Sequence, residues 1–221
     1  MGTPVAFFDL DRTLLAKNSA AAWLVYELRR GRVGLWNALR ASAWLVRYSL
    51  GTADVESALV ESIATQRGRR ERDIDERTRA FYASEVRAHF RPGGRRAVAE
   101  HRAHGERVVL LTSSSKYLSR LVAEELSLDA YLCTLLEVDD AGLFTGKPMG
   151  RVCFGEGKLV RAEAFAREAG VALGACSFYT DSAWDLPVLE VVRRAVAVNP
   201  DPRLARVARA RGWDVVDWGT P

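Results

Sequence analysis

A short apolar segment followed directly by two aspartates constrains this 221-residue chain more than any other feature. Residues Pro4–Phe8 are apolar and rich in aromatic side chains, which is typical of a buried strand. Asp9 and Asp11 follow at positions i and i+2, where both carboxylates would face one side of an extended chain and repel each other. A bound Mg²⁺ would relieve this repulsion, because it prefers carboxylate oxygens and is commonly held by one or two of them together with a phosphate. The alternative is a strand that simply ends in an aspartate-rich turn.

The same pair of aspartates is suited to phosphoryl chemistry. Asp9 could attack a phosphorus atom as a nucleophile, while Asp11 passes a proton to the leaving group.

Three further segments carry polar groups where a predicted strand ends or a predicted helix begins. An apolar run ends in hydroxyl side chains that start at Thr112, and hydroxyl groups together with backbone N–H groups at a helix start can bind phosphate. Lys158 opens an amphipathic segment, and another predicted strand runs into Asp181 and Asp185. A serine-rich turn, a solvated lysine and a helix-capping aspartate would explain each segment alone. Together they predict one site, because ligands bind at the carboxyl ends of the strands in open α/β sheets.

The order of predicted elements is a strand, a long helical insertion, and then alternating helices and strands. This order predicts an α/β fold with a doubly wound parallel sheet. The predicted strands are Val5–Leu10, Arg107–Thr112, Tyr131–Val138, Cys176–Thr180, Ala195–Asn199 and Asp214–Trp218. The predicted core helices lie near Gly94–His104, Ser115–Leu126, Lys158–Ala169, Ala183–Val192 and Pro202–Arg211.

We expect two domains. Residues 1–16 and 91–221 would form the core, and residues 17–90 would form a small, mobile helical cap inserted after the first strand. The segment Arg91-Pro92-Gly93-Gly94 has the composition of a hinge between them.

The motif order resembles the haloacid dehalogenase-like (HAD) hydrolases. The resemblance rests on Asp-x-Asp-x-Thr, a strand that ends in Thr-Ser, a lysine, and Asp-x-x-x-Asp, and the segments 91–94, 153–158 and 197–201 add to it. It is strongest to subfamily I with a helical cap between the first two motifs, the group of phosphoserine and histidinol-phosphate phosphatases. It extends from Val5 to about Trp218 and is weakest between residues 17 and 90.

The resemblance implies a role for each aspartate of the motifs. Asp9 would be the nucleophile that forms an aspartyl-phosphate, and Asp11 would be the general acid and base. Mg²⁺ would be bound by Asp9, by the backbone carbonyl of Asp11 and by Asp181, with Asp185 supporting this metal site from outside the ligand set.

The resemblance also implies a phosphate site. Thr112 and backbone N–H groups around Leu10, Asp11 and Ser113 would hold the phosphoryl oxygens, and Lys158 would neutralise their charge.

A second lysine competes for that role. Lys147 lies in Gly-Lys-Pro, which serves it in related subfamilies, but the sequence predicts a hairpin turn there, between strand-like runs at Cys133–Val138 and Arg151–Phe154. We favour Lys158, because it starts the helix that leads to the strand before Asp181.

These observations predict a Mg²⁺-dependent phosphatase that hydrolyses a small phosphorylated metabolite. A phosphotransferase on the same core and a non-catalytic protein that binds a phosphate ligand are the alternatives. Phosphoserine phosphatases carry an acidic cap residue nine positions after the nucleophile, where this chain has Asn18, although Arg67 or Arg70 could read a substrate carboxylate. Histidinol phosphate, phosphorylated amino alcohols, glycerol phosphate and lipid-like phosphates therefore all remain open.

Composition limits the partners. The chain has 32 basic and 28 acidic residues, and the basic excess is not clustered, so nucleic-acid binding is not indicated. Residues 35–50 are predicted to form an apolar helix with two arginines, too short and too charged to span a membrane. We expect this helix to pack within the cap, a dimer contact or an interfacial membrane helix being the alternatives. We expect a monomer or a homodimer without membrane association.

The remaining residues indicate the compartment. Cys133, Cys153 and Cys176 lack metal-site spacing and are expected to be buried thiols in a reducing environment. The chain enters its first strand without a signal peptide, so we expect a cytoplasmic protein. His89, His101 and His104 fall outside every motif and are expected at the surface.

Overall fold

The first strand, β1 (Val5–Phe8), occupies the middle of the main sheet. The structure, a computed structural model, describes residues 2–34 and 55–221; the predicted apolar helix at 35–50 lies outside these ranges. Val5 and Phe7 pack on one face of the sheet, Ala6 and Phe8 on the other, and all four are fully buried. A strand that is apolar on both faces requires cover on both sides, as parallel sheets provide.

The predicted doubly wound parallel sheet is confirmed. It has six strands in the order β3-β2-β1-β6-β7-β8, and every neighbouring pair is parallel. The strands after β1 are β2 (Arg107–Ser115), β3 (Ala130–Thr134), β6 (Ser177–Thr180), β7 (Arg194–Val198) and β8 (Asp214–Val216).

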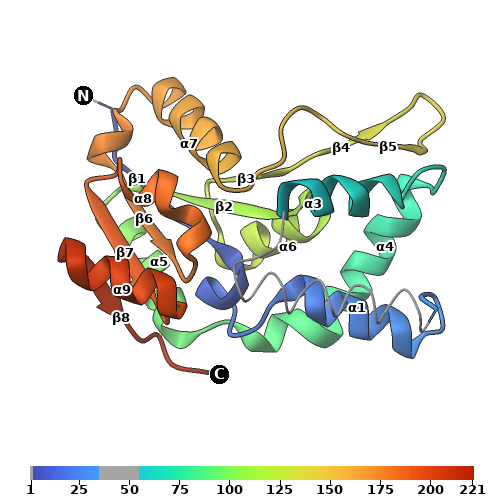
Figure 1. Cartoon of the computed structure of the whole chain (residues 1–221), viewed down its shortest axis with the longest axis horizontal. Helices are drawn as coiled ribbons and strands as arrows, with labels where there is room; N and C mark the ends of the chain where they lie inside the picture. The colour runs from blue at the N-terminus through green and yellow to red at the C-terminus, as the bar shows by residue number, and fades with distance from the viewer. Residues whose placement is uncertain (1, 35–54) are drawn as a thin grey trace.

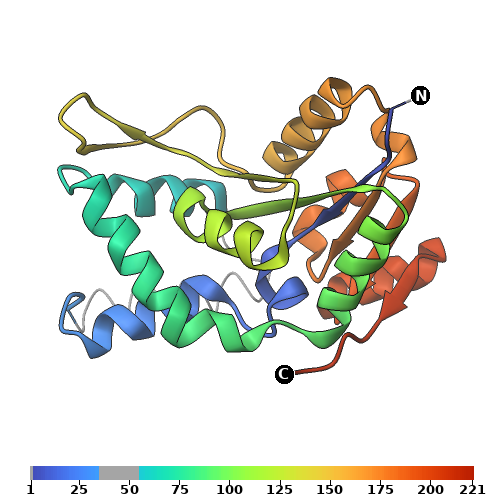
Figure 2. The same cartoon turned by 180° about the vertical axis from the view of Figure 1, so that it is seen from behind.

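Helices cover the two faces in separate layers. One face carries α5 and α6, which Figure 2 shows in front of the strands, and the other carries α7, α8 and α9. The bounds are α5 (Pro92–Ala103), α6 (Lys116–Leu126), α7 (Glu156–Glu168), α8 (Leu186–Leu189) and α9 (Pro202–Arg211). The short α8 replaces most of the helix expected at Ala183–Val192: a single 3₁₀ turn, Ala183–Asp185, precedes it.

The predicted strand Tyr131–Val138 is wrong in its second half. Only β3 joins the parallel sheet; the chain then leaves it and forms an antiparallel hairpin of β4 (Leu136–Val138) and β5 (Phe144–Pro148). Lys147 therefore lies in strand β5, where it is exposed, and not in a turn.

The segment between β1 and β2 is helical where the structure describes it. It contains α1 (Ser19–Arg29), α3 (Val55–Ala64) and α4 (Glu71–Phe81), followed by two short turns, Tyr82–Val86 and Arg87–His89. Figure 1 shows these helices beside the sheet, with the β4–β5 hairpin above α3.

The predictions for the cysteines and for His101 have different outcomes. All three cysteines are buried free thiols, as expected. His101 is not a surface residue: it is buried, and its ring nitrogens lie 2.5 Å from Glu106 Oε2 and 2.8 Å from Tyr179 Oη. Among the described residues, no helix combines the length and apolarity needed to cross a membrane.

Candidate active site

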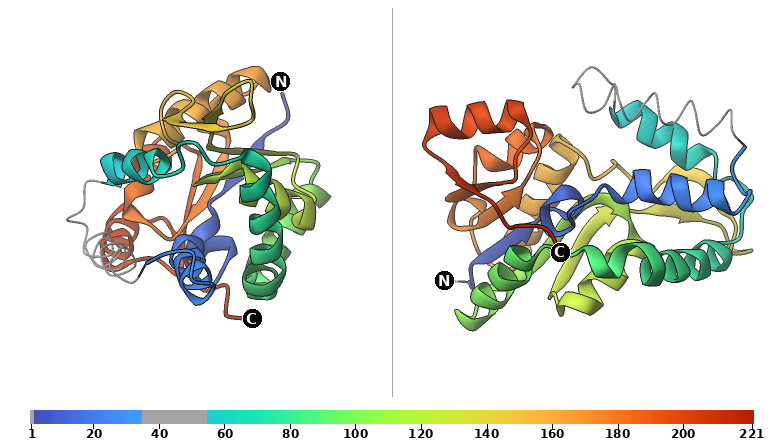
Figure 3. Two further views of the ribbon diagram at one scale, coloured as in Figure 1. Left: turned by 90° about the vertical axis from the view of Figure 1, so that its right-hand side faces the viewer. Right: turned by 90° about the horizontal axis from the view of Figure 1, so that it is seen from below.

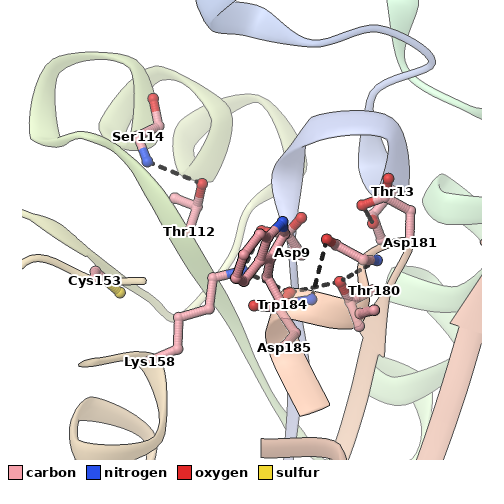
Figure 4. Close-up of polar contacts among 12 residues, drawn as sticks. Asp9, Thr13, Thr112, Ser114, Cys153, Lys158, Thr180, Asp181, Trp184 and Asp185 are labelled. Carbon is pink, nitrogen blue, oxygen red and sulfur yellow. Dashed lines mark hydrogen bonds and ion pairs between the residues drawn. The ribbon is translucent and has the colours of Figure 1, made fainter. Parts of the chain in front are cut away.

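A buried lysine bound by two carboxylates forms the centre of the candidate site. Lys158 Nζ donates to Asp9 Oδ1 at 2.7 Å and to Asp185 Oδ2 at 2.8 Å. The side chains are almost entirely buried, with 4% of Lys158, 10% of Asp9 and 2% of Asp185 exposed. Thr180 Oγ1 donates to the same Asp185 oxygen at 2.6 Å. Figure 4 shows this chain of contacts between the ends of β1 and β6 and the start of α7.

The backbone holds these groups at the sheet edge. Asp9 follows β1 directly, and its N–H still donates to the carbonyl of Tyr179 in β6 at 2.9 Å. Lys158 lies in the first turn of α7, on its buried side. Gly157, just before it, permits the tight approach of that turn, because a Cβ there would lie 2.0 Å from the carbonyl oxygen of Val152.

Burial dominates the electrostatics of this cluster. It raises the pKa of Asp9 to about 7, because the loss of solvation outweighs the attraction of Lys158. Burial alone would lower the pKa of Lys158, but the carboxylates of Asp185 and Asp9 raise it far above its usual value. The lysine is thus a permanent cation, whereas the carboxylates are held together at an energetic cost.

Asp181 lies next to this cluster. Burial, reinforced by the nearby charges of Asp9 and Asp185, raises its pKa well above the ordinary value. Thr13 Oγ1 donates to Asp181 Oδ1 at 3.5 Å, and the Asp181 carbonyl accepts from the N–H of Asp201 at 2.8 Å.

Asp11 is oriented by the first helix of the insertion. It lies in the irregular turn Leu10–Leu14, and its Oδ1 accepts from the N–H of Ser19, the first residue of α1, at 2.7 Å. Burial raises the pKa of Asp11, while this hydrogen bond opposes the shift. Asn18, the residue at the position of the acidic cap residue, serves as the N-cap of α1 and accepts from Ala21 N–H at 2.9 Å.

The predicted phosphate-binding residues occupy the turn after β1 and the end of β2. Leu10 is buried, and Thr112 and Ser113 lie in the last residues of β2. The Thr112 hydroxyl oxygen accepts from Ser114 N–H at 3.2 Å. Within residues 2–34 and 55–221 no direct hydrogen bond links Thr112 to Asp9.

Three supporting residues were not predicted from sequence. Thr13 contacts Asp181, Thr180 contacts Asp185, and Asp201 Oδ2 accepts from Ala183 N–H at 2.9 Å. Thr13 and Thr180 lie within two residues of a motif aspartate, and this proximity in sequence could have predicted their place in the site. Asp201 also caps α9, because its Oδ1 accepts from the N–H groups of Arg203 and Leu204.

The donor atoms are compatible with Mg²⁺. The described residues contain no group of three acidic, histidine or cysteine side chains gathered around one point. The predicted ligand set needs only the carboxylates of Asp9 and Asp181 and the main-chain oxygen of Asp11, and Mg²⁺ commonly takes few protein ligands and keeps several waters. The raised pKa values of Asp9 and Asp181 fit this set, because a cation would relieve the repulsion between them.

A cavity of about 370 Å³ lies between the insertion and the loops that carry Lys158 and Asp181. Phe154 and Trp184 line it from the core, with ring centroids 5.6 Å apart. Glu56 of α3 lines it from the insertion, and Arg151 Nε donates to Glu56 Oε1 at 3.2 Å. Glu156 adds a second carboxylate. The cavity is next to the candidate site in the chain, because its lining residues Gly155 and Ala183 are three and two positions from Lys158 and Asp181.

A family model described as haloacid dehalogenase-like hydrolase matches residues 6–190. The chain therefore belongs to the haloacid dehalogenase-like hydrolases, and the prediction is confirmed for the family and for the enzyme class.

Similar proteins are known across almost the whole chain. A histidinol-phosphatase of Neisseria meningitidis is 30% identical over 97% of this chain and 98% of its own length. The phosphoserine phosphatase SerB1 of Mycobacterium tuberculosis is 32% identical over 98% of this chain and 71% of its own length. A crystal structure of a Bordetella pertussis protein of unknown function is 31% identical, with a TM-score of 0.88 over 99% of this chain and 100% of that one.

Proposed function

We propose that this HAD-family phosphatase hydrolyses a small phosphomonoester through an aspartyl-phosphate on Asp9, with Mg²⁺ as cofactor. The observation that carries the proposal is the buried contact between Asp9 and Lys158 at 2.7 Å. A cation at this distance favours the ionised form of Asp9 against the effect of burial and offsets the charge of an incoming phosphate.

The proposed reaction has two displacements. An Asp9 carboxylate oxygen attacks phosphorus, the bond from phosphorus to the ester oxygen breaks, and Asp11 gives its proton to that oxygen. Asp11 then takes a proton from a water that attacks the aspartyl-phosphate, so that inorganic phosphate leaves and the Asp9 carboxylate is restored. Mg²⁺, held by Asp9, the Asp11 carbonyl and Asp181, would supply charge stabilisation for the phosphoryl group.

The remaining groups would bind the phosphoryl group or hold Lys158 in place. Thr112 and the backbone N–H groups of Leu10, Asp11 and Ser113 would hold the phosphoryl oxygens. Asp185 would hold Lys158 toward Asp9, and its contact with Lys158 at 2.8 Å supports this role.

We further propose that the leaving group is cationic and carries a ring, as in histidinol phosphate. Glu156 and an aromatic pair line the 370 Å³ cavity, and the other two charged residues in the described part of the lining, Glu56 and Arg151, pair with each other. Such a lining favours an amine or an imidazole over a free carboxylate. The Neisseria relative of that name supports the proposal. Arg67, an alternative reader of a carboxylate, instead donates to the carbonyl of Thr145 in the hairpin at 3.0 Å.

The test compares wild type, Asp9→Asn and Asp140→Asn. The purified proteins are given p-nitrophenyl phosphate with Mg²⁺ or with EDTA, and phosphate release is measured. We expect Asp9→Asn to fold normally and to lose at least ~10³-fold in turnover, because an amide cannot form the acyl-phosphate. Asp140, exposed in the hairpin turn, provides the matched control and should leave turnover unchanged.

Folded Asp9→Asn protein with more than a few per cent of wild-type turnover would contradict the nucleophile assignment. Wild-type turnover that persists in EDTA would contradict the proposed requirement for Mg²⁺. A panel of histidinol phosphate, phosphoserine and glycerol phosphate tests the leaving group, and added alcohols test phosphotransfer, because an acceptor would then carry the phosphate.

A further inference from the structure

Arg91 is a buried cation outside the catalytic cluster. It immediately precedes α5, in the segment that the sequence identified as a hinge, and only 7% of it is exposed. Its guanidinium donates through Nε to the carbonyl of Arg12 at 3.1 Å and through Nη1 to the carbonyl of Gly219. Its backbone N–H donates to the carbonyl of Leu14 at 2.8 Å. One side chain thus joins the turn after β1 to the carboxyl-terminal tail.

Arg91 contacts the turn Leu10–Leu14, which follows Asp9 directly and contains Asp11. Arg12 has φ +58° and ψ −5°, a left-handed conformation that is unfavourable for a residue with a side chain and therefore needs outside support. The Arg12 carbonyl belongs to the peptide bond between Arg12 and Thr13. Thr13 contacts Asp181, and Asp11, on the other side of Arg12, accepts from the N–H of Ser19. A bond to that carbonyl therefore restrains both sides of the site.

The tail offers a fixed anchor for the other end of Arg91. Trp218 packs directly on α5, where a Cβ at Gly93 would lie 2.5 Å from its ring. Gly93 N–H donates to the Trp218 carbonyl at 3.1 Å, and Trp218 N–H donates to Asn199 Oδ1 at 3.0 Å. Figure 3 shows the tail, in dark red, reaching the blue turn that follows β1.

We propose that Arg91 is a positioning residue that holds the turn Leu10–Leu14 in its catalytic conformation by tying the Arg12 carbonyl to the tail carbonyl of Gly219. The proposal rests on the proposed function. Arg91 touches no reacting atom, so its loss should misplace Asp11 without removing any substrate contact. Misplacement of catalytic groups lowers turnover much more than it weakens substrate binding.

The experiment measures kcat, KM and Tm with p-nitrophenyl phosphate for wild type, Arg91→Met, Arg91→Lys and the control Arg96→Met. Arg96 lies in α5, the helix that Arg91 precedes, and it is exposed. We expect Arg91→Met to lower kcat ~10- to 100-fold with KM changed less than ~3-fold. Arg91→Lys keeps the charge and can make one of the two hydrogen bonds, so its kcat should lie between those of Arg91→Met and wild type. A further variant, Arg91→Ala, leaves room for a guanidinium ion, and millimolar guanidinium should restore part of its kcat.

A truncated variant that ends at Trp218 provides a second test in case Arg91→Met does not fold. This truncation removes the Gly219 carbonyl and leaves Arg91 intact, and it should lower kcat with KM preserved. The inference is overturned if folded Arg91→Met matches Arg96→Met in kcat, if the loss lies in KM, or if the truncation has wild-type kcat. A wild type without activity would overturn the proposed function and this inference with it, whereas an active wild type beside an unaffected Arg91→Met overturns the inference alone.

Discussion

Lys158 shows at the scale of one residue how burial and charge are balanced. A buried ammonium would normally be too costly, but two carboxylates within 2.8 Å compensate it. Asp9 is restrained in the same contact, so the proposed nucleophile and its counter-charge are placed together. Lys147, the rival in the sequence, lies exposed in β5, and its N–H donates to Thr145 Oγ1 at 3.3 Å.

The two lysines can be separated by matched substitutions. We expect Lys158→Met to lose ~10²- to 10³-fold in turnover, because the charge on the phosphoryl group loses its fixed cation. It should also lower the free energy of unfolding by ~3–5 kcal/mol, because Asp9 and Asp185 are left buried without their counter-charge. Turnover and urea unfolding are measured beside Lys147→Met, which should resemble wild type. Loss of activity in Lys147→Met alone would show that the lysine was assigned wrongly.

At the scale of elements, the β4–β5 hairpin fastens the insertion to the core. Phe144, 2% exposed, packs with Ile63 of α3 and Tyr117 of α6. Its backbone N–H donates to the carbonyl of Arg69 at 2.9 Å, and its carbonyl accepts from Gly68 N–H at 2.8 Å. A cap that closes over the site, as the sequence predicts, must move with this hairpin or break these contacts.

The hairpin and α6 together anchor α4 as well. Arg120 Nη2 of α6 donates to Asp75 Oδ1 at 2.6 Å, and Tyr117 Oη donates to Glu71 Oε1 at 3.0 Å. Mixed charges of this kind are, by themselves, typical of a solvated helix face. Only the tertiary arrangement shows that basic and phenolic partners lie opposite them.

Phe144→Ala tests whether the hairpin stabilises the insertion. We expect a loss of ~3–5 kcal/mol in local stability, because the cavity left by a buried phenyl ring is poorly refilled. Hydrogen exchange should accelerate together in residues 55–81 and 136–148, while α5 stays protected. Val215→Ala, at a half-exposed position of β8, is the control. Unchanged exchange in 55–81 would mean that the insertion is stable without the hairpin.

At the scale of the molecule, the sheet order explains why the sequence motifs could be joined into one site. β1 lies between β2 and β6, and all run parallel, so the residues after their carboxyl ends meet at one edge. Apolar runs and their polar ends were sufficient to predict this much. The departure of the chain after β3 could not be predicted, because Tyr131–Val138 contains no glycine or proline to mark the break, and the break depends on what the second half pairs with.

The supporting contacts also escaped prediction for a physical reason. Thr180 is an ordinary strand residue until the fold brings the Asp185 carboxylate within 2.6 Å of its hydroxyl. The composition of residues 91–94 predicts a hinge. It does not reveal that Gly93 and Gly94 also provide space for Trp218, because that contact depends on the tertiary fold.

The clustered carboxylates make the stability of the whole molecule depend on pH and metal together. Burial raises the pKa of Asp9 from 3.8 to about 7 and also raises those of Asp11 and Asp181. Between these pH values the folded chain binds more protons than the unfolded chain, so without metal the contribution of these groups to stability falls as pH rises from about 4 to about 7. A cation bound to the ionised carboxylates should reverse that loss.

We therefore expect Mg²⁺ to raise the Tm above its value in EDTA, and by more at about pH 8 than at about pH 5. At the lower pH protons compete for the same oxygens, so less metal binds. Tryptophan fluorescence during heating gives the four Tm values that are needed. Asp181→Ala should lose most of the Mg²⁺-dependent increase, whereas Asp140→Asn should keep it. An increase that is equal at both pH values, or that persists in Asp181→Ala, would mean that Mg²⁺ binds elsewhere on the protein.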